Sequence, residues 1–163
     1  MKWESVRLTQ SKLEELAQVL DEVAHHYVKI SGDALMRVQF GKPYKSDGSR
    51  IPHSRMAMLV HFYAPELRPE LDALTKITER YGEVLAEAIR DVERNTQQKQ
   101  ELNSRLLAGA HKIEDQCEEM SKKAAAVASA HLERLTANQS LHRTLKPLRS
   151  FSSLRWLRQL LRR

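Results

Sequence analysis

Apolar residues recur at three- and four-residue steps along most of the chain, which is the spacing of one face of an α-helix. The first stripe begins at Leu13 and extends to Val38. Ser11 and Glu14 have the spacing of a capping box, so we expect this helix to begin near Ser11, although a threonine two residues earlier competes as the cap. Gly41 is the expected end, because glycine readily adopts the left-handed conformation that closes a helix.

Turn-forming residues divide the next part of the chain into a loop, a short helix and a long helix. Residues 41–53 contain two prolines and two glycines and are expected to form the loop. A short helix that is apolar nearly all round is expected over residues 54–62. Pro65 suits the first position of the following helix, whose apolar stripe runs from Leu67 to Val92.

The polar stretch 95–101 separates this stripe from the last one. It contains neither glycine nor proline, so it fits either a short connection or a polar layer within one continuous helix, and we favour a break. The last stripe runs from Leu102 to Leu135, and its helix is expected to end near Asn138. The alanine-rich residues 123–130 indicate a close approach to a neighbouring helix.

Three long amphipathic helices and one short helix cannot bury their apolar stripes alone. Packing them side by side predicts an all-α fold, with an antiparallel helical bundle over residues 1–140. No stretch of six residues alternates apolar and polar positions, so strands are not expected. Residues 141–163 are expected to form a separate C-terminal tail.

The positive charge of the chain is concentrated in that tail. The chain has 27 basic and 21 acidic residues, and seven of the basic residues but none of the acidic ones lie in residues 141–163. Residues 1–140 therefore hold 20 basic against 21 acidic residues and are close to neutral. A near-neutral body with a cationic end favours an acidic counterpart such as lipid headgroups, nucleic acid or a carboxylate-rich surface.

From Ser152 onward, the tail has the pattern of a basic amphipathic helix. At steps of about 100° around a helix axis, its leucines fall within one arc of about 120°, and no arginine enters that arc. Trp156 lies on the border between the two faces, a position typical of residues at a membrane interface. The residues expected to bind an anionic surface are Arg149, Arg155, Trp156, Arg158, Arg162 and Arg163.

Three interpretations of the tail are open. The leucines pack on the bundle while the arginines face solvent, or the helix attaches to an anionic membrane surface, or the arginines contact nucleic-acid phosphates. The tail has few aromatic rings for base stacking and the body has no basic stripe, which disfavours sequence-specific recognition of nucleic acid.

The single cysteine and the absence of targeting signals bear on location. Cys117 cannot form an internal disulfide, which suits a reducing compartment. The sequence has no secretory signal and no apolar run of about 18–20 residues, so we expect a cytoplasmic protein that lies at most on the surface of the inner membrane. Four nearby carboxylates would oppose formation of the thiolate, so Cys117 is expected to be inert.

Patterns that would indicate catalysis or metal binding are weak. Seven histidines are present, but no His-Glu-x-x-His or Cys-x-x-Cys spacing occurs. His25 and His26 are adjacent and point about 100° apart on a helix. A site assembled between helices from His25, His61 or His111 is the one conceivable metal centre. Glu22 and His25 form the only Glu-x-x-His pair, which disfavours a di-iron bundle. We expect no enzymatic activity, no cofactor, no metal and no small-molecule substrate.

The segment from Met56 to Leu71, with Pro65 at its turn, resembles a short helix and a Tyr-Phe-Pro-Glu-Leu-like turn found in small, mostly uncharacterised bacterial inner-membrane proteins. Those proteins have a cytoplasmic helical bundle. The resemblance covers residues 3–92 and implies a helical bundle and a bacterial origin, but no activity and no functional residues. This chain has no membrane helix before Trp3, so the resemblance implies a soluble relative or a chain whose N-terminal anchor is missing.

Together these patterns predict a non-enzymatic helical-bundle protein that acts through association with a protein partner or with its own copies. The basic tail is expected to attach it to an anionic membrane surface or an acidic partner. The alternative is a nucleic-acid-binding accessory protein whose tail arginines contact phosphates.

Overall fold

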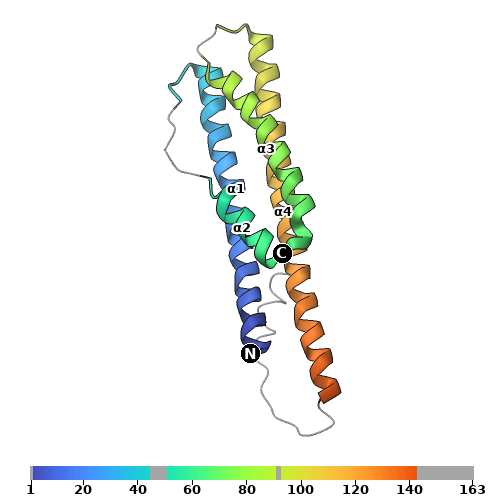
Figure 1. Ribbon diagram of the computed structural model, residues 1–163. Helices are drawn as coiled ribbons and strands as arrows, with labels where there is room; N and C mark the ends of the chain where they lie inside the picture. Colours follow the sequence, from blue (N-terminus) through green and yellow to red (C-terminus); the bar gives the residue numbers. More distant parts are fainter. Residues whose placement is uncertain (1, 45–50, 91–92, 143–163) are drawn as a thin grey trace. The chain divides into compact units, whose positions relative to one another are not determined.

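The computed structural model describes residues 2–44, 51–90 and 93–142 of the chain. Every regular element in these ranges is helical, which confirms the all-α class and the expected three long helices and one short helix (Figure 1). The elements are α1 (Lys2–Phe40), α2 (His53–Tyr63), a single 3-10 turn (Pro65–Leu67), α3 (Arg68–Ile89) and α4 (Thr96–His142).

The predicted start of the first helix is wrong, whereas its predicted end is confirmed. α1 begins at Lys2, and Ser11 lies exposed within the helix instead of capping it. Residues 2–10 contain no glycine or proline, and Glu4 in the first turn suits the positive end of the helix, so nothing delays helix formation until Ser11. At the other end, Gly41 has a φ of 65° and donates its N–H to the carbonyl of Arg37 at 2.8 Å.

The short helix and the turn after it agree with expectation. α2 begins and ends within one residue of the predicted bounds 54–62. Pro65 begins a 3-10 turn, closed by the N–H of Leu67 donating to the carbonyl of Ala64 at 2.9 Å, and α3 follows at Arg68. Proline suits this position because its missing N–H would have no partner there.

The chain does break between the third and fourth helices, but most of the polar stretch 95–101 is helical. α3 ends at Ile89 and α4 begins at Thr96. Asn95 is the cap: its side-chain oxygen accepts from the N–H of Gln98 at 2.9 Å, and the Gln98 side chain accepts from the N–H of Asn95 at 3.0 Å. α4 then continues to His142, beyond the predicted end at Asn138.

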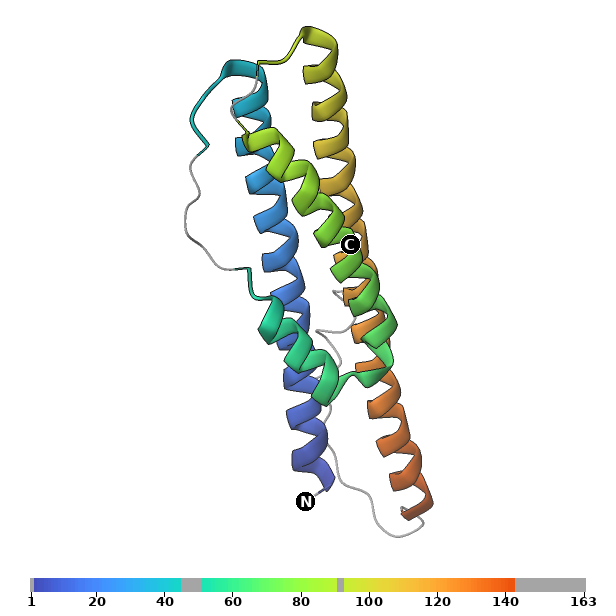
Figure 2. The same ribbon diagram turned by 45° about the horizontal axis from the view of Figure 1, so that its top comes forward.

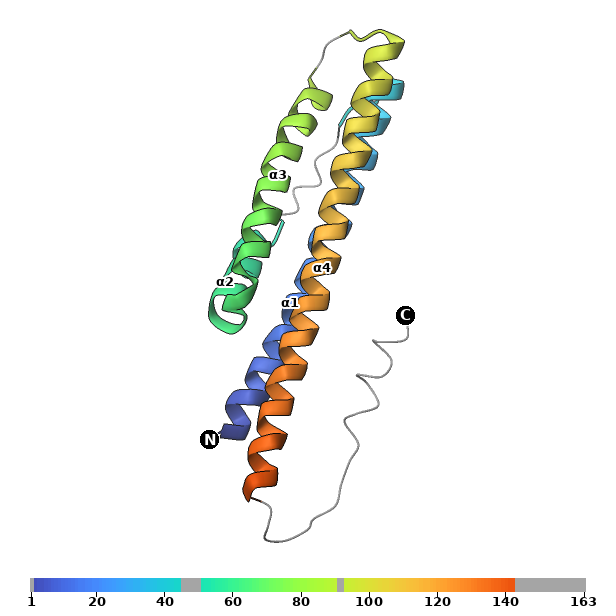
Figure 3. The same cartoon turned by 90° about the vertical axis from the view of Figure 1, so that its right-hand side faces the viewer.

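Residues Met1–Ala130 form one compact unit, and the domain boundary predicted at residue 140 stays a prediction. Arg105 on α4 forms an ion pair with Glu87 on α3 at 2.9 Å. Further along α4, Lys123 reaches Glu70, near the start of α3, at 2.6 Å, so these two helices run in opposite directions. α1 lies beside this part of α4 (Figure 3), where side chains of both helices line one groove. These contacts support helical-bundle character.

A close contact between helices is centred on the buried Tyr81 of α3. Its ring lies against Gly109 of α4, where an added Cβ would overlap Cδ2 and lie 3.0 Å from Cε2 of the ring. The Tyr81 hydroxyl is hydrogen-bonded to the Ser31 hydroxyl of α1, and Ser31 donates to the carbonyl of Tyr27 at 2.5 Å. The rings of Tyr27 and Tyr81 meet edge to face, with centroids 5.6 Å apart. We call Tyr27, Ser31, Tyr81 and Gly109 the tyrosine hub.

The close approach predicted at residues 123–130 stays a prediction, although Val127 and Ala128 on one face of this segment pack against the core. Ala124 is buried, but Ala125 and Ala126 face solvent. One glycine beside a buried ring, and not a run of alanines, permits the tight contact at Gly109.

The hub predicts opposite effects for two Gly→Ala substitutions. Gly109→Ala should lower the free energy of unfolding by about 1–3 kcal/mol, because the new methyl group overlaps a buried ring that cannot swing aside. Gly82→Ala, on an exposed position of α3 with no heavy atom within 4 Å, should raise it by about 0.5–1 kcal/mol through helix propensity. Urea unfolding followed by circular dichroism measures both. Stabilisation by Gly109→Ala would contradict this packing.

Candidate functional site

The residues predicted to bind an anionic surface lie outside the part of the chain that the structure describes. Their helical conformation and their role therefore stay predictions. The residues concerned are Arg149, Arg155, Trp156, Arg158, Arg162 and Arg163.

Within the described residues, cationic side chains gather in a hollow of about 300 Å³, which we call the basic pocket. Four of these described lining residues are cationic and one is acidic. The pocket is lined by Arg37, Val38, Gly41, Arg90, Glu93, Arg94 and Lys99.

Three helix ends bring these side chains together. Arg37 lies in the last turn of α1, Arg90 and Arg94 lie in the connection from α3 to α4, and Lys99 lies in the first turn of α4. The C-terminal ends of α1 and α3 and the start of α4 lie at the same end of the bundle, which comes forward in Figure 2. The pocket therefore depends on where each of the three helices stops or begins.

Arg94 also holds the end of α3 in place. Its guanidinium donates to the backbone carbonyls of Glu87 and Arg90, the latter at 3.5 Å. These carbonyls lack partners within the helix because α3 ends there, and an arginine at a helix C-terminus is favourable. Arg94 thus fixes one wall of the basic pocket while its side chain remains half-buried.

A second hollow of about 290 Å³ lies on the other side of Arg90 and Arg94, towards α4. Its lining adds Glu87, Glu101 and Arg105 to the shared Arg90, Glu93 and Arg94, so its arginines and glutamates are equal in number. Glu87 and Arg105 are paired at 2.9 Å. Of these two hollows, the basic pocket has the more cationic lining among the residues that the structure describes.

A polar contact that the sequence did not predict joins α2 to α1. The Tyr27 hydroxyl and Nε2 of His53 are hydrogen-bonded at 3.1 Å, and His53 is the first residue of α2. Burial lowers the pKa of His53 from its usual 6.5, and the nearby His26 lowers it further. Burial also raises the pKa of Tyr27. A tyrosine within an apolar stripe was the available signal, because a buried hydroxyl requires a partner.

The lowered pKa of His53 predicts that the protein loses stability on acidification. The unfolded chain binds a proton near pH 6.5, whereas the folded chain accepts it only at lower pH, so stability falls as pH falls through this window. Urea midpoints measured from about pH 7.5 to about pH 5.5 should show this slope. His53→Gln should flatten the slope, and His61→Gln, at an exposed position of the same helix, should retain it. Equal slopes for both variants would contradict the assignment.

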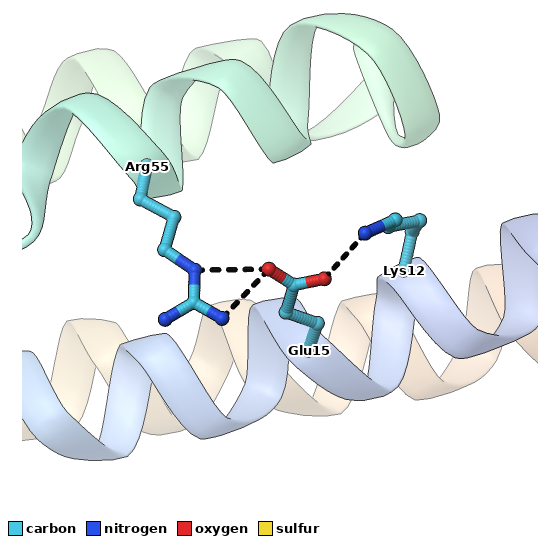
Figure 4. Close-up of polar contacts among 3 residues, drawn as sticks. All are labelled: Lys12, Glu15 and Arg55. Carbon is cyan, nitrogen blue, oxygen red and sulfur yellow. Dashed lines mark hydrogen bonds and ion pairs between the residues drawn. The ribbon is translucent and has the colours of Figure 1, made fainter.

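Glu15 of α1 forms two ion pairs, one with Arg55 of α2 and one with Lys12 of its own helix (Figure 4). One carboxylate oxygen accepts from Nε of Arg55 at 2.9 Å, and the other accepts from Nζ of Lys12 at 2.7 Å. The hydrogen bond from Lys12 lowers the pKa of Glu15, and Arg55 lowers it further. Such exposed pairs contribute little stability, so we interpret the pair of Glu15 with Arg55 as setting the register between α1 and α2.

Cys117 is buried between α1 and α4 beside a groove of about 240 Å³. Burial raises the pKa of its thiol to about 12, and Asp21 of α1 adds to the shift. The protonated thiol agrees with the expected inertness, but the cause differs: burial dominates, and the contributing carboxylate comes from α1 and not from the flanking acids of α4.

The structure does not bring the candidate metal ligands together. His25, His61 and His111 are all exposed, and His111 lies 3.5 Å from Glu114 of its own helix. Among the described residues, no group of three or more His, Cys, Asp or Glu side chains is arranged to hold a metal ion.

Comparison with known proteins identifies no relative of this chain. The chain matches no protein-family model, no curated protein and no solved structure. In the ranges that the structure covers, no helix has both the length and the apolar character needed to cross a bilayer. The predicted resemblance to bacterial inner-membrane proteins stays a prediction.

Proposed function

We propose that this protein is a non-enzymatic interaction protein that attaches to an anionic membrane surface through its C-terminal tail. In this proposal the four helices form an antiparallel bundle, and residues 141–163 supply a basic amphipathic helix. The observation that carries the proposal is the charge partition, with seven basic and no acidic residues in the tail and a near-neutral body. We propose the cytoplasmic side of the inner membrane as its location.

The separation of leucine from arginine in the tail favours a membrane surface over the other acidic counterparts. Leucines and Trp156 would enter the interfacial region while the arginines meet anionic headgroups, at about 1 kcal/mol for each basic residue near the surface. A nucleic acid would use the arginines but would leave the leucine face without a partner.

Exposed apolar side chains on α1 and α2 support a protein partner or a second copy of the chain. Leu8, Met58 and Phe62 are 51%, 46% and 76% exposed. The ion pair between Glu15 and Arg55 sets their register: Leu8 lies seven residues before Glu15 and Phe62 seven residues after Arg55, which places both at the same end of these helices. Large apolar side chains exposed at one end of neighbouring helices are candidates for a contact surface.

The proposal predicts a large loss of membrane binding when the tail loses charge. Replacing Arg155, Arg158, Arg162 and Arg163 by Gln in the full chain should reduce partition onto phosphatidylserine-containing vesicles at least about a hundredfold, since each arginine contributes about 1 kcal/mol. Co-sedimentation measures this, and added salt should weaken binding of the unmodified protein. Vesicles of phosphatidylcholine alone should bind little.

The matched control removes four exposed cations of the body. Replacing Arg7, Lys76, Arg80 and Lys112 by Gln changes the net charge equally, and this variant should bind anionic vesicles nearly as well as the unmodified chain. Equal partition of the two variants would contradict the proposal. A gel shift with duplex DNA tests the alternative. If the tail variant alone loses DNA binding while its vesicle binding is unchanged, the tail binds nucleic acid instead of a membrane surface.

A further inference from the structure

We propose that the groove between α1 and α4 receives residues 152–163 of a second copy of the chain. The groove has a volume of about 240 Å³, and each of the two helices lines one side of it. The inference rests on the amphipathic helix that the proposed function assigns to the tail, but it does not require a membrane. It names the surface through which the protein would meet its own copies.

The inner part of the groove is apolar and its α1 side carries small side chains. Leu20 and Cys117 are the most buried lining residues, at 1% and 2% exposed. Ala17 and Ala24 lie seven residues apart on the same face of α1, and both are partly exposed. Small side chains allow another helix to approach closely. The groove can therefore accept the apolar face of a helix.

Two exposed apolar side chains lie beyond one end of the groove. Val28 lies seven residues after Asp21 on α1, and it is 46% exposed. Leu107 lies seven residues before Glu114 on α4, and it is 47% exposed. α1 and α4 run in opposite directions (Figures 1 and 3), so both side chains lie beyond the same end. The part of α1 from Ala17 to Val28 is about 17 Å long, close to the length of about 18 Å for a helix of twelve residues.

Carboxylates on both sides of the groove favour a basic occupant. Asp21 lies on the α1 side, and Glu114 and Glu118 lie on the α4 side. Glu118 is paired with Lys122 of its own helix at 2.5 Å, but both side chains are exposed, so exchanging the partner costs little. Glu114 lies 3.5 Å from His111. Asp21 forms no ion pair with any residue that the structure describes.

The tail carries cations on both borders of its apolar face. On a helix, the leucines of residues 152–163 occupy an arc of about 120°, with Arg158 about 40° beyond one edge and Arg163 about 60° beyond the other. When the leucines lie in the groove, these two arginines reach opposite sides of it, where the carboxylates lie. Pairing the groove with the same groove of a second copy would instead bring carboxylates together.

The length of the chain favours a second copy as the source of the segment. Ser121 is the lining residue nearest the C-terminal end of α4, and the 21 residues from there to His142 correspond to about 32 Å of helix. Residues 143–151 span at most about 30–32 Å when fully extended. The same chain could bring Ser152 back to the groove only with this connection at its full length, whereas a second copy has no such limit.

Sedimentation equilibrium of the full chain without lipid tests the inference. The unmodified protein should self-associate reversibly as its concentration rises. Replacing Asp21 and Glu114 together by Lys should weaken this association at least about tenfold, because the arginines of the second copy then meet positive charge. The matched control replaces Glu22 and Asp115 by Lys, since these exposed acids follow directly on the same helices but do not line the groove. The control should associate within about twofold of the unmodified protein.

A mixing experiment shows whether the tail of one copy contacts the groove of another. Leu157→Ser with Leu161→Ser in the full chain weakens the apolar face of the tail and should also reduce self-association at least about tenfold. This tail variant has an intact groove, and the groove variant with Asp21→Lys and Glu114→Lys has an intact tail. The mixture should therefore associate more strongly than either variant alone. Circular dichroism must show the same helical content in the groove variant and its control.

Three results would overturn the inference. They are an unmodified chain that stays monomeric at every concentration, equal association of the groove variant and its control, and a mixture that associates no better than its components. Association that is insensitive to the groove variant but lost in Phe62→Ser would assign the interface to the exposed apolar side chains of α1 and α2. The groove variant should keep its binding to phosphatidylserine vesicles, so either proposal can fail while the other stands.

Discussion

The buried contact of Tyr81 with Ser31 and Gly109 is the constraint on which the arrangement of helices depends. The Tyr81 hydroxyl is the donor to Ser31, because the Ser31 proton is already committed to the carbonyl of Tyr27. The Tyr81 ring fits only because position 109 has no side chain. Tyr81 thus fixes both the axial position and the rotation of α3 relative to α1 and α4. Apolar stripes alone would allow one helix to shift along the axis of its neighbour, whereas a hydrogen bond between buried groups does not allow that shift.

The basic pocket follows from this constraint. Arg37 lies six residues after Ser31, Arg90 nine after Tyr81, and Lys99 ten before Gly109, which corresponds to about 9–15 Å along the helix axes. With the register fixed at the hub, the ends of α1 and α3 and the start of α4 meet at one end, and their cations come together. The pocket thus depends on the register between the three helices. It lies at the end of the helices and away from the core, so its cations stay near solvent.

Much of the fold could be predicted from the sequence, because helical periodicity and the effects of glycine and proline are local. Gly41 and Pro65 marked boundaries correctly for that reason. The capping pattern at Ser11 gave a wrong helix start. Such a pattern permits a helix to begin but does not require it, and no helix-breaking residue precedes Ser11. The pocket could not be predicted, since its cations are scattered through a body with no net basic stripe and only the packing of three helices unites them. The sequence alone supports the tail as an anionic-surface site.

A double-mutant cycle on Ser31 and Tyr81 tests the central claim most directly. Urea unfolding of the unmodified protein, Ser31→Ala, Tyr81→Phe and the double variant gives the coupling free energy between the two hydroxyls. Ser31→Ala leaves the buried Tyr81 hydroxyl without its acceptor, and Tyr81→Phe leaves Ser31 with only its bond to the Tyr27 carbonyl, so we predict a coupling of about 1 kcal/mol or more. Free-energy changes that add to within about 0.3–0.5 kcal/mol would contradict the hub as the determinant of helix register.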